Sequence, residues 1–160
     1  MKKSSIRAAL LRGAACLAAL ALVLPGAGFA ADHGGHSDSE WAYMPAAGGA
    51  LNKPAYYLHR NDIVIENGVI FQGDNNQILC LAGRTLIVKL AAVPKNREFI
   101  VTAPLTIESC SGKGELTVTG GPIEVYEPLT LTENVTVSGD IEVKTYSPQT
   151  GSLTVGAAAP

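Results

Sequence analysis

The chain has 160 residues, 47% of them hydrophobic, with 12 Lys and Arg against 14 Asp and Glu. Positions 1–30 carry four basic side chains and no acidic one, so positions 31–160 hold eight Lys and Arg against 14 Asp and Glu, a net charge of −6. An acidic surface is not drawn to nucleic acid or anionic lipid, so the sequence argues against both as partners.

Residues 1–30 have the features of a secretory signal peptide. A cationic start over 2–12 precedes an apolar stretch from Ala14 to Leu24 and a run of small residues from Pro25 to Ala30. The apolar stretch is shorter than a membrane span requires, and no later stretch approaches that length. We therefore expect a chain that starts at Ala31 and is secreted or held at the cell surface.

Residues 31–53 read as a polar leader with Gly and His, and its aromatic residues are suited to cap the N-terminal end of a domain. Cleavage before Ala31 would create the terminus Ala31-Asp32-His33. A free amine, two amide nitrogens and a third-position imidazole form a square-planar site for Cu(II) or Ni(II). The alternative is a flexible leader whose His residues bind nothing.

From residue 54 to 156 the sequence alternates short β-branched segments with Gly, Pro, Asn and Asp. The phrase Leu116-Thr117-Val118 returns as Val135-Thr136-Val137 and as Leu153-Thr154-Val155, at nearly equal steps. Ile123-Glu124-Val125 returns as Ile141-Glu142-Val143, and Pro104-Leu105-Thr106-Ile107 returns as Pro128-Leu129-Thr130-Leu131. A nearly fixed period with apolar, polar, apolar strands predicts an all-β stacked solenoid of about five coils, followed by a disordered tail at 157–160.

The period-two pattern assigns side chains to the inside and outside of the coils. Predicted inward side chains are Leu105, Ile107, Leu116, Val118, Ile123, Val125, Leu129, Leu131, Val135, Val137, Ile141, Val143, Leu153 and Val155. Thr117, Thr136 and Thr154 are expected to form an outward ladder, and Glu124 and Glu142 to share an outward column. Two carboxylates one strand apart repel each other unless Ca²⁺, a Lys or solvent screens them.

The C-terminal coil has no obvious cap in the sequence, so its strand edges invite end-to-end self-association. Two cysteines, Cys80 and Cys110, follow the predicted signal. In an exported chain they are suited to form a disulfide, although the repeat alignment places Cys80 level with Val101 and Cys110 near Ala91. The alternative is a pair of buried thiols that pack as small apolar groups.

Several segments carry a resemblance to a known group of proteins. These are His33, His36 and Trp41, then Tyr56-Tyr57-Leu58, then Leu79-Cys80-Leu81-Ala82-Gly83, and then Leu105 to Gly114 with Cys110. In this order they resemble secreted bacterial cell-surface proteins with an N-terminal pectin-lyase-like, right-handed parallel β-helix. The chain departs from that pattern at Ala82, where the family favours Asn, and at Ser109, where it favours Asp. The resemblance implies the handedness, the location and a role in adhesion or glycan contact.

The resulting hypothesis is an exported, non-catalytic β-helix module that contacts a surface glycan or protein. Thr117, Thr136, Glu124 and Glu142 represent its binding face. The alternatives are a polysaccharide-lyase-like enzyme on the same scaffold and an N-terminal Cu(II) or Ni(II) binder. A lyase would need an acidic Ca²⁺ site and a basic residue in one groove, and no spacing forces Arg60, Asp62, Asp74 and Arg84 together.

Overall fold

The computed structural model describes residues 41–90, 98–146 and 149–157, all of which belong to the unit Ala31–Pro160. The described residues form strands, turns and bends, and none is helical, which confirms the all-β prediction for this part. No described segment is a helix long and apolar enough to cross a membrane. The predicted signal at 1–30 and residues 158–160 of the predicted tail lie outside the described residues.

In chain order the strands are β1 (Ala42–Tyr43), β2 (Gly49–Leu51), β3 (Ala55–Tyr57), β4 (Ile63–Ile65), β5 (Val69–Phe71), β6 (Gln77–Cys80), β7 (Thr85–Lys89), β8 (Phe99–Val101), β9 (Leu105–Glu108), β10 (Gly114–Thr119), β11 (Ile123–Val125), β12 (Pro128–Thr132), β13 (Val135–Ser138), β14 (Ile141–Val143), β15 (Thr145–Tyr146), β16 (Gln149–Thr150) and β17 (Ser152–Ala157).

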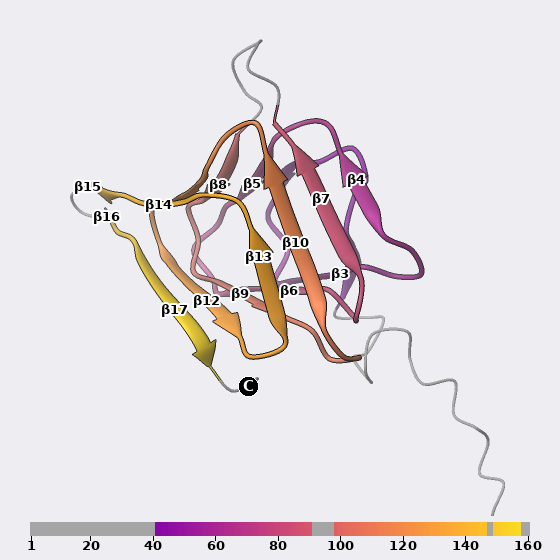
Figure 1. The fold of residues 1–160 in the computed structure, drawn as a ribbon. Coiled ribbons are helices and arrows are strands. Elements are labelled where there is room, and N and C mark those ends of the chain that lie inside the picture. Colours follow the sequence, from indigo (N-terminus) through magenta and orange to yellow (C-terminus); the bar gives the residue numbers. More distant parts are fainter. Residues whose placement is uncertain (1–40, 91–97, 147–148, 158–160) are drawn as a thin grey trace, which may run out of the picture. The chain divides into compact units, whose positions relative to one another are not determined.

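Three parallel sheets contain all of these strands except one small hairpin. Sheet A has the order β1-β3-β6-β9-β12-β17, sheet B the order β14-β11-β8-β5-β2, and sheet C the order β13-β10-β7-β4. From β3 onward the chain visits sheets A, C and B in turn and then returns to the next strand of sheet A, with β15 and β16 inserted as an antiparallel pair before β17 (Figure 1). This order, with parallel neighbours, is consistent with a parallel β-helix or solenoid.

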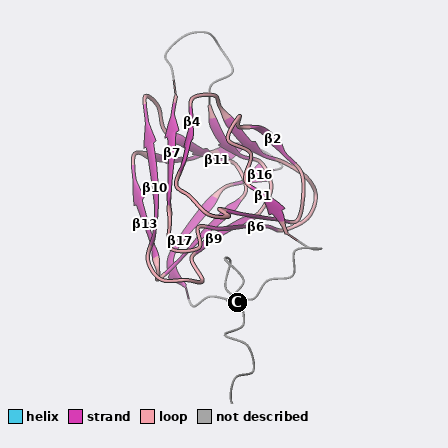
Figure 2. Ribbon diagram, turned by 90° about the vertical axis from the view of Figure 1, so that its right-hand side faces the viewer, coloured by secondary structure: helices cyan, strands magenta, loops and turns pink. Residues whose placement is uncertain are grey.

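The core fills the space that the three sheets enclose (Figure 2). Alternate side chains of each strand point into it, because successive residues of a strand face opposite sides. Eight of the predicted inward side chains are buried, which confirms their assignment: Leu105, Ile107, Leu116, Val118, Ile123, Val125, Leu129 and Leu131. Val135, Val137 and Ile141 are partly buried and pack against the same cluster.

The predicted burial fails in the last coil. Val143, Leu153 and Val155 keep 43%, 38% and 68% of their surface exposed. They do pair with buried partners, since Val143 is level with Val125 and Val155 with Leu131. However, β14 and β17 are edge strands of their sheets, so in the described part of the chain no further rung covers these side chains.

The register confirms two of the three sequence repeats and corrects the third. Leu105 pairs with Leu129, and Ile123 pairs with Ile141, as the repeats predict. Leu153 pairs with Leu129 and not with a residue of the Leu116 repeat to which it was assigned. Leu116, however, pairs with Val137, and Val135 pairs with Gly114. The error is two residues, which leaves inward side chains inward because the side-chain period of a strand is also two.

Part of the expected leader belongs to the sheets. Strand β1 pairs with β3 at the edge of sheet A, and β2 pairs with β5 at the edge of sheet B. Sequence reasoning missed both strands, because β1 is only two residues long and β2 consists of Gly, Ala and Leu, with no β-branched residue. The described part of the leader therefore supplies the first rungs of two sheets.

One corner of the fold brings together the two positions that depart from the resembled pattern. Ala82 has φ of +51°, a left-handed conformation that Asn adopts more readily than Ala. The Ser109 hydroxyl accepts a hydrogen bond of 2.8 Å from the backbone N–H of Gly83, a role that the carboxylate of Asp fills equally well. At Gly83 itself a Cβ would lie 2.7 Å from the carbonyl oxygen of Ser111, so successive corners are in close contact.

Candidate functional site

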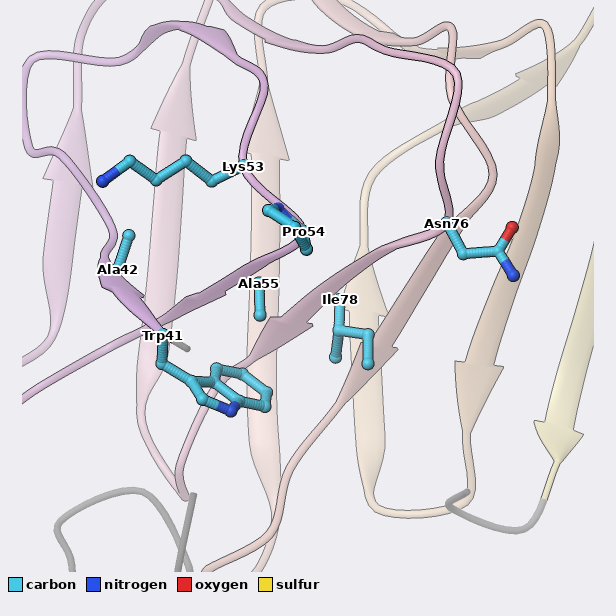
Figure 3. Close-up of a pocket in the computed structure, with 7 residues that line it drawn as sticks. All are labelled: Trp41, Ala42, Lys53, Pro54, Ala55, Asn76 and Ile78. Atoms are coloured by element: carbon cyan, nitrogen blue, oxygen red, sulfur yellow. The ribbon is translucent and has the colours of Figure 1, made fainter. Parts of the chain in front are cut away.

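An open pocket of about 550 Å³ lies beside the first rungs of sheet A. Its lining comes from the starts of β1, β3 and β6 and from the residues just before them. It consists of Trp41, Ala42, Lys53, Pro54, Ala55, Asn76 and Ile78. Figure 3 shows the indole ring of Trp41 extending toward Ala55 and Ile78. The lining is therefore an aromatic ring and small apolar groups, with one ammonium group and one amide.

A second aromatic layer supports Trp41. Its ring meets that of Tyr57 edge-on, with 6.2 Å between centroids, and Tyr57 is only 1% exposed. Tyr57 belongs to a small apolar cluster with Cys80 and Ala82, separate from the main core. Tyr43 packs on the rings of both Tyr57 and His59. Trp41, Tyr43 and Tyr57 therefore contact one another, and their role as an N-terminal cap stays a prediction.

The backbone around Lys53 is held from two sides. The Tyr56 hydroxyl accepts hydrogen bonds of 3.0 Å from the N–H groups of Asn52 and Lys53. The Gln77 side-chain Nε2 donates to the carbonyl oxygens of Leu51, Lys53 and Gln72, at 3.0, 3.1 and 3.2 Å. Gln77 pairs with Leu105, whose side chain points into the core, so Gln77 occupies an inward position of sheet A. From there its side chain holds the loop that carries Lys53.

The outward column that starts in the pocket continues across sheet A. Because Ala42 pairs with Tyr56, the preceding Trp41 lies level with Ala55. Ala55 pairs with Ile78, and Ile78 pairs with Thr106. The column then runs through Thr130 to Thr154. Thr106, Thr130 and Thr154 therefore form a ladder on sheet A, in the same column as the pocket residues Ala55 and Ile78.

This arrangement corrects the predicted ladder of Thr117, Thr136 and Thr154. On sheet C, Thr117 pairs with Ser138, and Thr136 pairs with Glu115. The Thr117 hydroxyl donates to Glu115 Oε1 at 3.2 Å. Thr154 lies on a different sheet because the chain, after β14 of sheet B, returns to sheet A and forms β17 there. The repeated three-residue phrase therefore does not mark one face.

Sheet B brings Glu124 and Glu142 together as predicted, since the two residues pair across β11 and β14. The Tyr126 hydroxyl donates to Glu124 Oε2 at 2.8 Å, and Lys144 Nζ lies 2.6 Å from Glu142 Oε1. The hydrogen bond to Glu142 raises the pKa of Lys144, and the hydrogen bond to Glu124 raises the pKa of Tyr126. Each carboxylate thus has a donor of its own. The four predicted binding-face residues are divided between sheets B and C.

Cys80 and Cys110 lie in contact. Their sulfur atoms are 2.9 Å apart as thiols, with Cys80 buried and Cys110 exposed. Burial, and next the hydrogen bond with Cys110, raise the pKa of Cys80 to about 12. The expected column was wrong, because Cys80 pairs with Tyr57 on one side and with Glu108 on the other. Cys110 follows Glu108 by two residues and folds back over Cys80.

The predicted Cu(II) or Ni(II) ligands Ala31, Asp32 and His33 lie outside the described residues. Within residues 41–90, 98–146 and 149–157, no three His, Cys, Asp or Glu side chains gather to hold a metal ion. Of the candidates for lyase chemistry, Asp62 accepts a hydrogen bond of 2.8 Å from the backbone N–H of Thr85, a contact that joins β7 to the loop before β4.

No family model, curated protein or solved structure matches the chain. Sequence reasoning placed Trp41 at the N-terminal end but missed its pocket partners Lys53 and Ile78. Their proximity depends on β1 joining sheet A, and a two-residue strand leaves no periodic signal in the sequence.

Proposed function

We propose that this chain is an exported, non-catalytic parallel β-helix module that binds a glycan in the Trp41 pocket. The observation that carries the proposal is the indole of Trp41 beside Ala55 and Ile78 in an open pocket of about 550 Å³. Pockets of roughly 300–1,000 Å³ with an apolar lining and a few placed polar groups are typical of small-ligand sites. The apolar face of a sugar ring stacks on such an aromatic ring while its hydroxyls stay in water.

The polar groups of the lining favour an acidic sugar. Lys53 is the only ionisable residue among the pocket's lining residues, and its ammonium is suited to pair with a carboxylate. General acid–base turnover requires one group that takes a proton and one that gives it, and the lining residues include Lys53 as their single ionisable side chain. This lining supports binding of an acidic glycan over its cleavage.

The helix is right-handed with about five coils, since crossover connections between parallel strands are right-handed in about 98% of cases. The basic, apolar and small-residue segments of residues 1–30 support export. The ordered Tyr-Tyr-Leu, Leu-Cys-Leu and Cys110 segments, which resemble bacterial cell-surface β-helix proteins, support a place at the cell surface.

Trp41 is the only tryptophan of the chain, so intrinsic fluorescence reports directly on the pocket. We expect uronic-acid oligosaccharides to change the emission of Trp41 in a saturable way. By calorimetry, Trp41→Ala should weaken binding by about tenfold or more, the loss typical of an aromatic anchor. Lys53→Gln should weaken binding of the acidic oligosaccharide and leave binding of its neutral counterpart unchanged.

The matched control is Tyr126→Ala, which removes an aromatic ring that directly follows β11 of sheet B and should leave the affinity unchanged. Equal losses in Tyr126→Ala and Trp41→Ala would place the glycan elsewhere or show a general effect on folding. Release of unsaturated uronate products, followed by their ultraviolet absorbance, would replace the binding proposal with a lyase.

A further inference from the structure

We propose that Cys80 and Cys110 form an intramolecular disulfide that joins two successive coils at one corner, and that Cys110 reacts first. The two sulfur atoms are 2.9 Å apart, within reach of a bond of about 2.05 Å after a small movement. The sequence alone left this pairing open, and its repeat alignment placed the two residues in different columns.

The backbone around both residues is held in place independently of the sulfur atoms. Leu81 N–H donates to the Glu108 carbonyl oxygen at 2.8 Å, and Gly83 N–H donates to the Ser109 hydroxyl at 2.8 Å. These two bonds join the residues that directly follow Cys80 to the residues that directly precede Cys110. The corner therefore presents the two thiols to each other whether or not they are bonded.

The difference in exposure sets the order of the two steps. Cys110 is exposed and Cys80 is fully buried, so an external disulfide reaches only Cys110. In the first step the Cys110 thiolate attacks an oxidant of the disulfide class, such as oxidised glutathione, and releases one thiol. In the second step the Cys80 thiolate attacks Cys110 Sγ and releases the other. The protein loses two protons and two electrons, and the oxidant is reduced to two thiols.

The buried position also protects the product. A reducing thiol attacks one sulfur atom of a disulfide in line with the bond, and here only Cys110 Sγ is accessible from solvent. The Cys80 side is covered by Tyr57 and Ala82 with Trp41 packed against them. The bond therefore closes the whole coil between Cys80 and Cys110 and holds the cluster that supports the pocket.

The test uses the purified full chain with Cys16→Ser, so that Cys80 and Cys110 are the only cysteines. The folded chain is equilibrated with reduced and oxidised glutathione, acid-quenched, alkylated without reduction and digested with trypsin. Cleavage after Arg60, Arg84, Arg97 and Lys113 puts Cys80 in peptide 61–84 and Cys110 in peptide 98–113. We expect a cross-linked pair of these two peptides in nearly all chains and a mass about 2 Da below that of the dithiol.

Two single variants test the order of reaction. Cys80→Ser should accumulate a stable glutathione adduct at Cys110, and folded Cys110→Ser should leave Cys80 unmodified. Alkylation of both thiols at equilibrium in the parent chain would overturn the proposal, as would a cross-link between two molecules. A glutathione adduct at Cys80 in folded Cys110→Ser would overturn the order. Because Cys110 is exposed, its replacement by Ser should leave the fold intact, which far-ultraviolet circular dichroism checks.

Discussion

Tyr57 pairs with Cys80 across β3 and β6, so the ring that supports Trp41 and the thiol that meets Cys110 are neighbours in one column of sheet A. Both side chains point away from the main core, yet both are buried, at 1% and 0% exposure. A second apolar cluster thus lies on the outer side of the sheet. It connects the candidate glycan pocket to the corner that holds the two cysteines.

This relationship predicts a specific effect of Tyr57→Ala. Loss of a fully buried aromatic side chain costs about 3–5 kcal/mol of unfolding free energy, and it also leaves the indole of Trp41 without its edge-on partner. Urea denaturation should show this destabilisation, and the emission of Trp41 in the folded state should shift to longer wavelength as water reaches the ring.

Tyr43→Ala is the matched control, because Tyr43 contacts the ring of Tyr57 but keeps 59% of its surface exposed. Its cost should stay below about 1 kcal/mol, as for most surface substitutions. An unshifted Trp41 emission in folded Tyr57→Ala would mean that the indole is held by other contacts.

The buried side chains of most strands could be predicted from the sequence, because successive residues of a strand face opposite sides and apolar residues alternate with polar ones. Leu129 and Leu131 alternate with Thr130, and β12 buries both leucines. The repeat from Leu105 to Leu129 was read correctly because Pro104 and Pro128 mark the same corner twice. Within the described residues, the alternation and these corners were enough to identify parallel sheets.

The register and the site could not be predicted in the same way. Leu116-Thr117-Val118 and Leu153-Thr154-Val155 are nearly identical in sequence, yet they lie on sheets C and A. Between them the chain passes through sheet B, so the later copy falls on the next strand of sheet A, and a three-residue phrase carries no signal of the sheet to which it belongs. The contact between Cys80 and Cys110 was missed for a related reason: the coil that separates them is longer than the period of the sequence repeats.

Close contact between coils predicts a large effect of Gly120→Ala. A Cβ at this position would lie 1.8 Å from the carbonyl oxygen of Leu90, and φ is +87°. The backbone of two adjacent coils would have to separate, so we expect a loss of more than about 3 kcal/mol in unfolding free energy, measured by urea denaturation.

Gly73→Ala measures the cost of the strained backbone conformation without the contact between coils that Gly120→Ala would also disturb. Gly73 also has positive φ, +139°, but nothing lies within 4 Å of a Cβ built there. Its substitution should cost only about 1–2 kcal/mol, from the strained backbone alone. Equal losses in the two variants would show that the conformation dominates and that the coils can move apart at Gly120.

The thiol chemistry has a predicted pH dependence. Cys80 is flanked by the strands of Tyr57 and Glu108 and covered by Cys110, and burial is the main reason that its pKa is raised to about 12. The hydrogen bond with the Cys110 thiol is lost once Cys110 carries glutathione, but burial remains and keeps the pKa of Cys80 above that of an ordinary thiol. The attacking species in the closing step is the Cys80 thiolate, whose population grows about tenfold per pH unit below its pKa. Closure should therefore be slow at pH 7 and keep accelerating up to pH 10. An ordinary thiol would reach its plateau near pH 9.

The measurement starts from the reduced Cys16→Ser chain. A short pulse of oxidised glutathione forms the adduct at Cys110, rapid desalting removes the excess, and the loss of adduct mass is followed at each pH. Cys80→Ser is the control, because a serine hydroxyl does not attack the mixed disulfide and the adduct should persist. A closing rate that levels off between pH 8 and 9 would show that Cys80 ionises as an exposed thiol does, and that the corner around it opens before the bond forms.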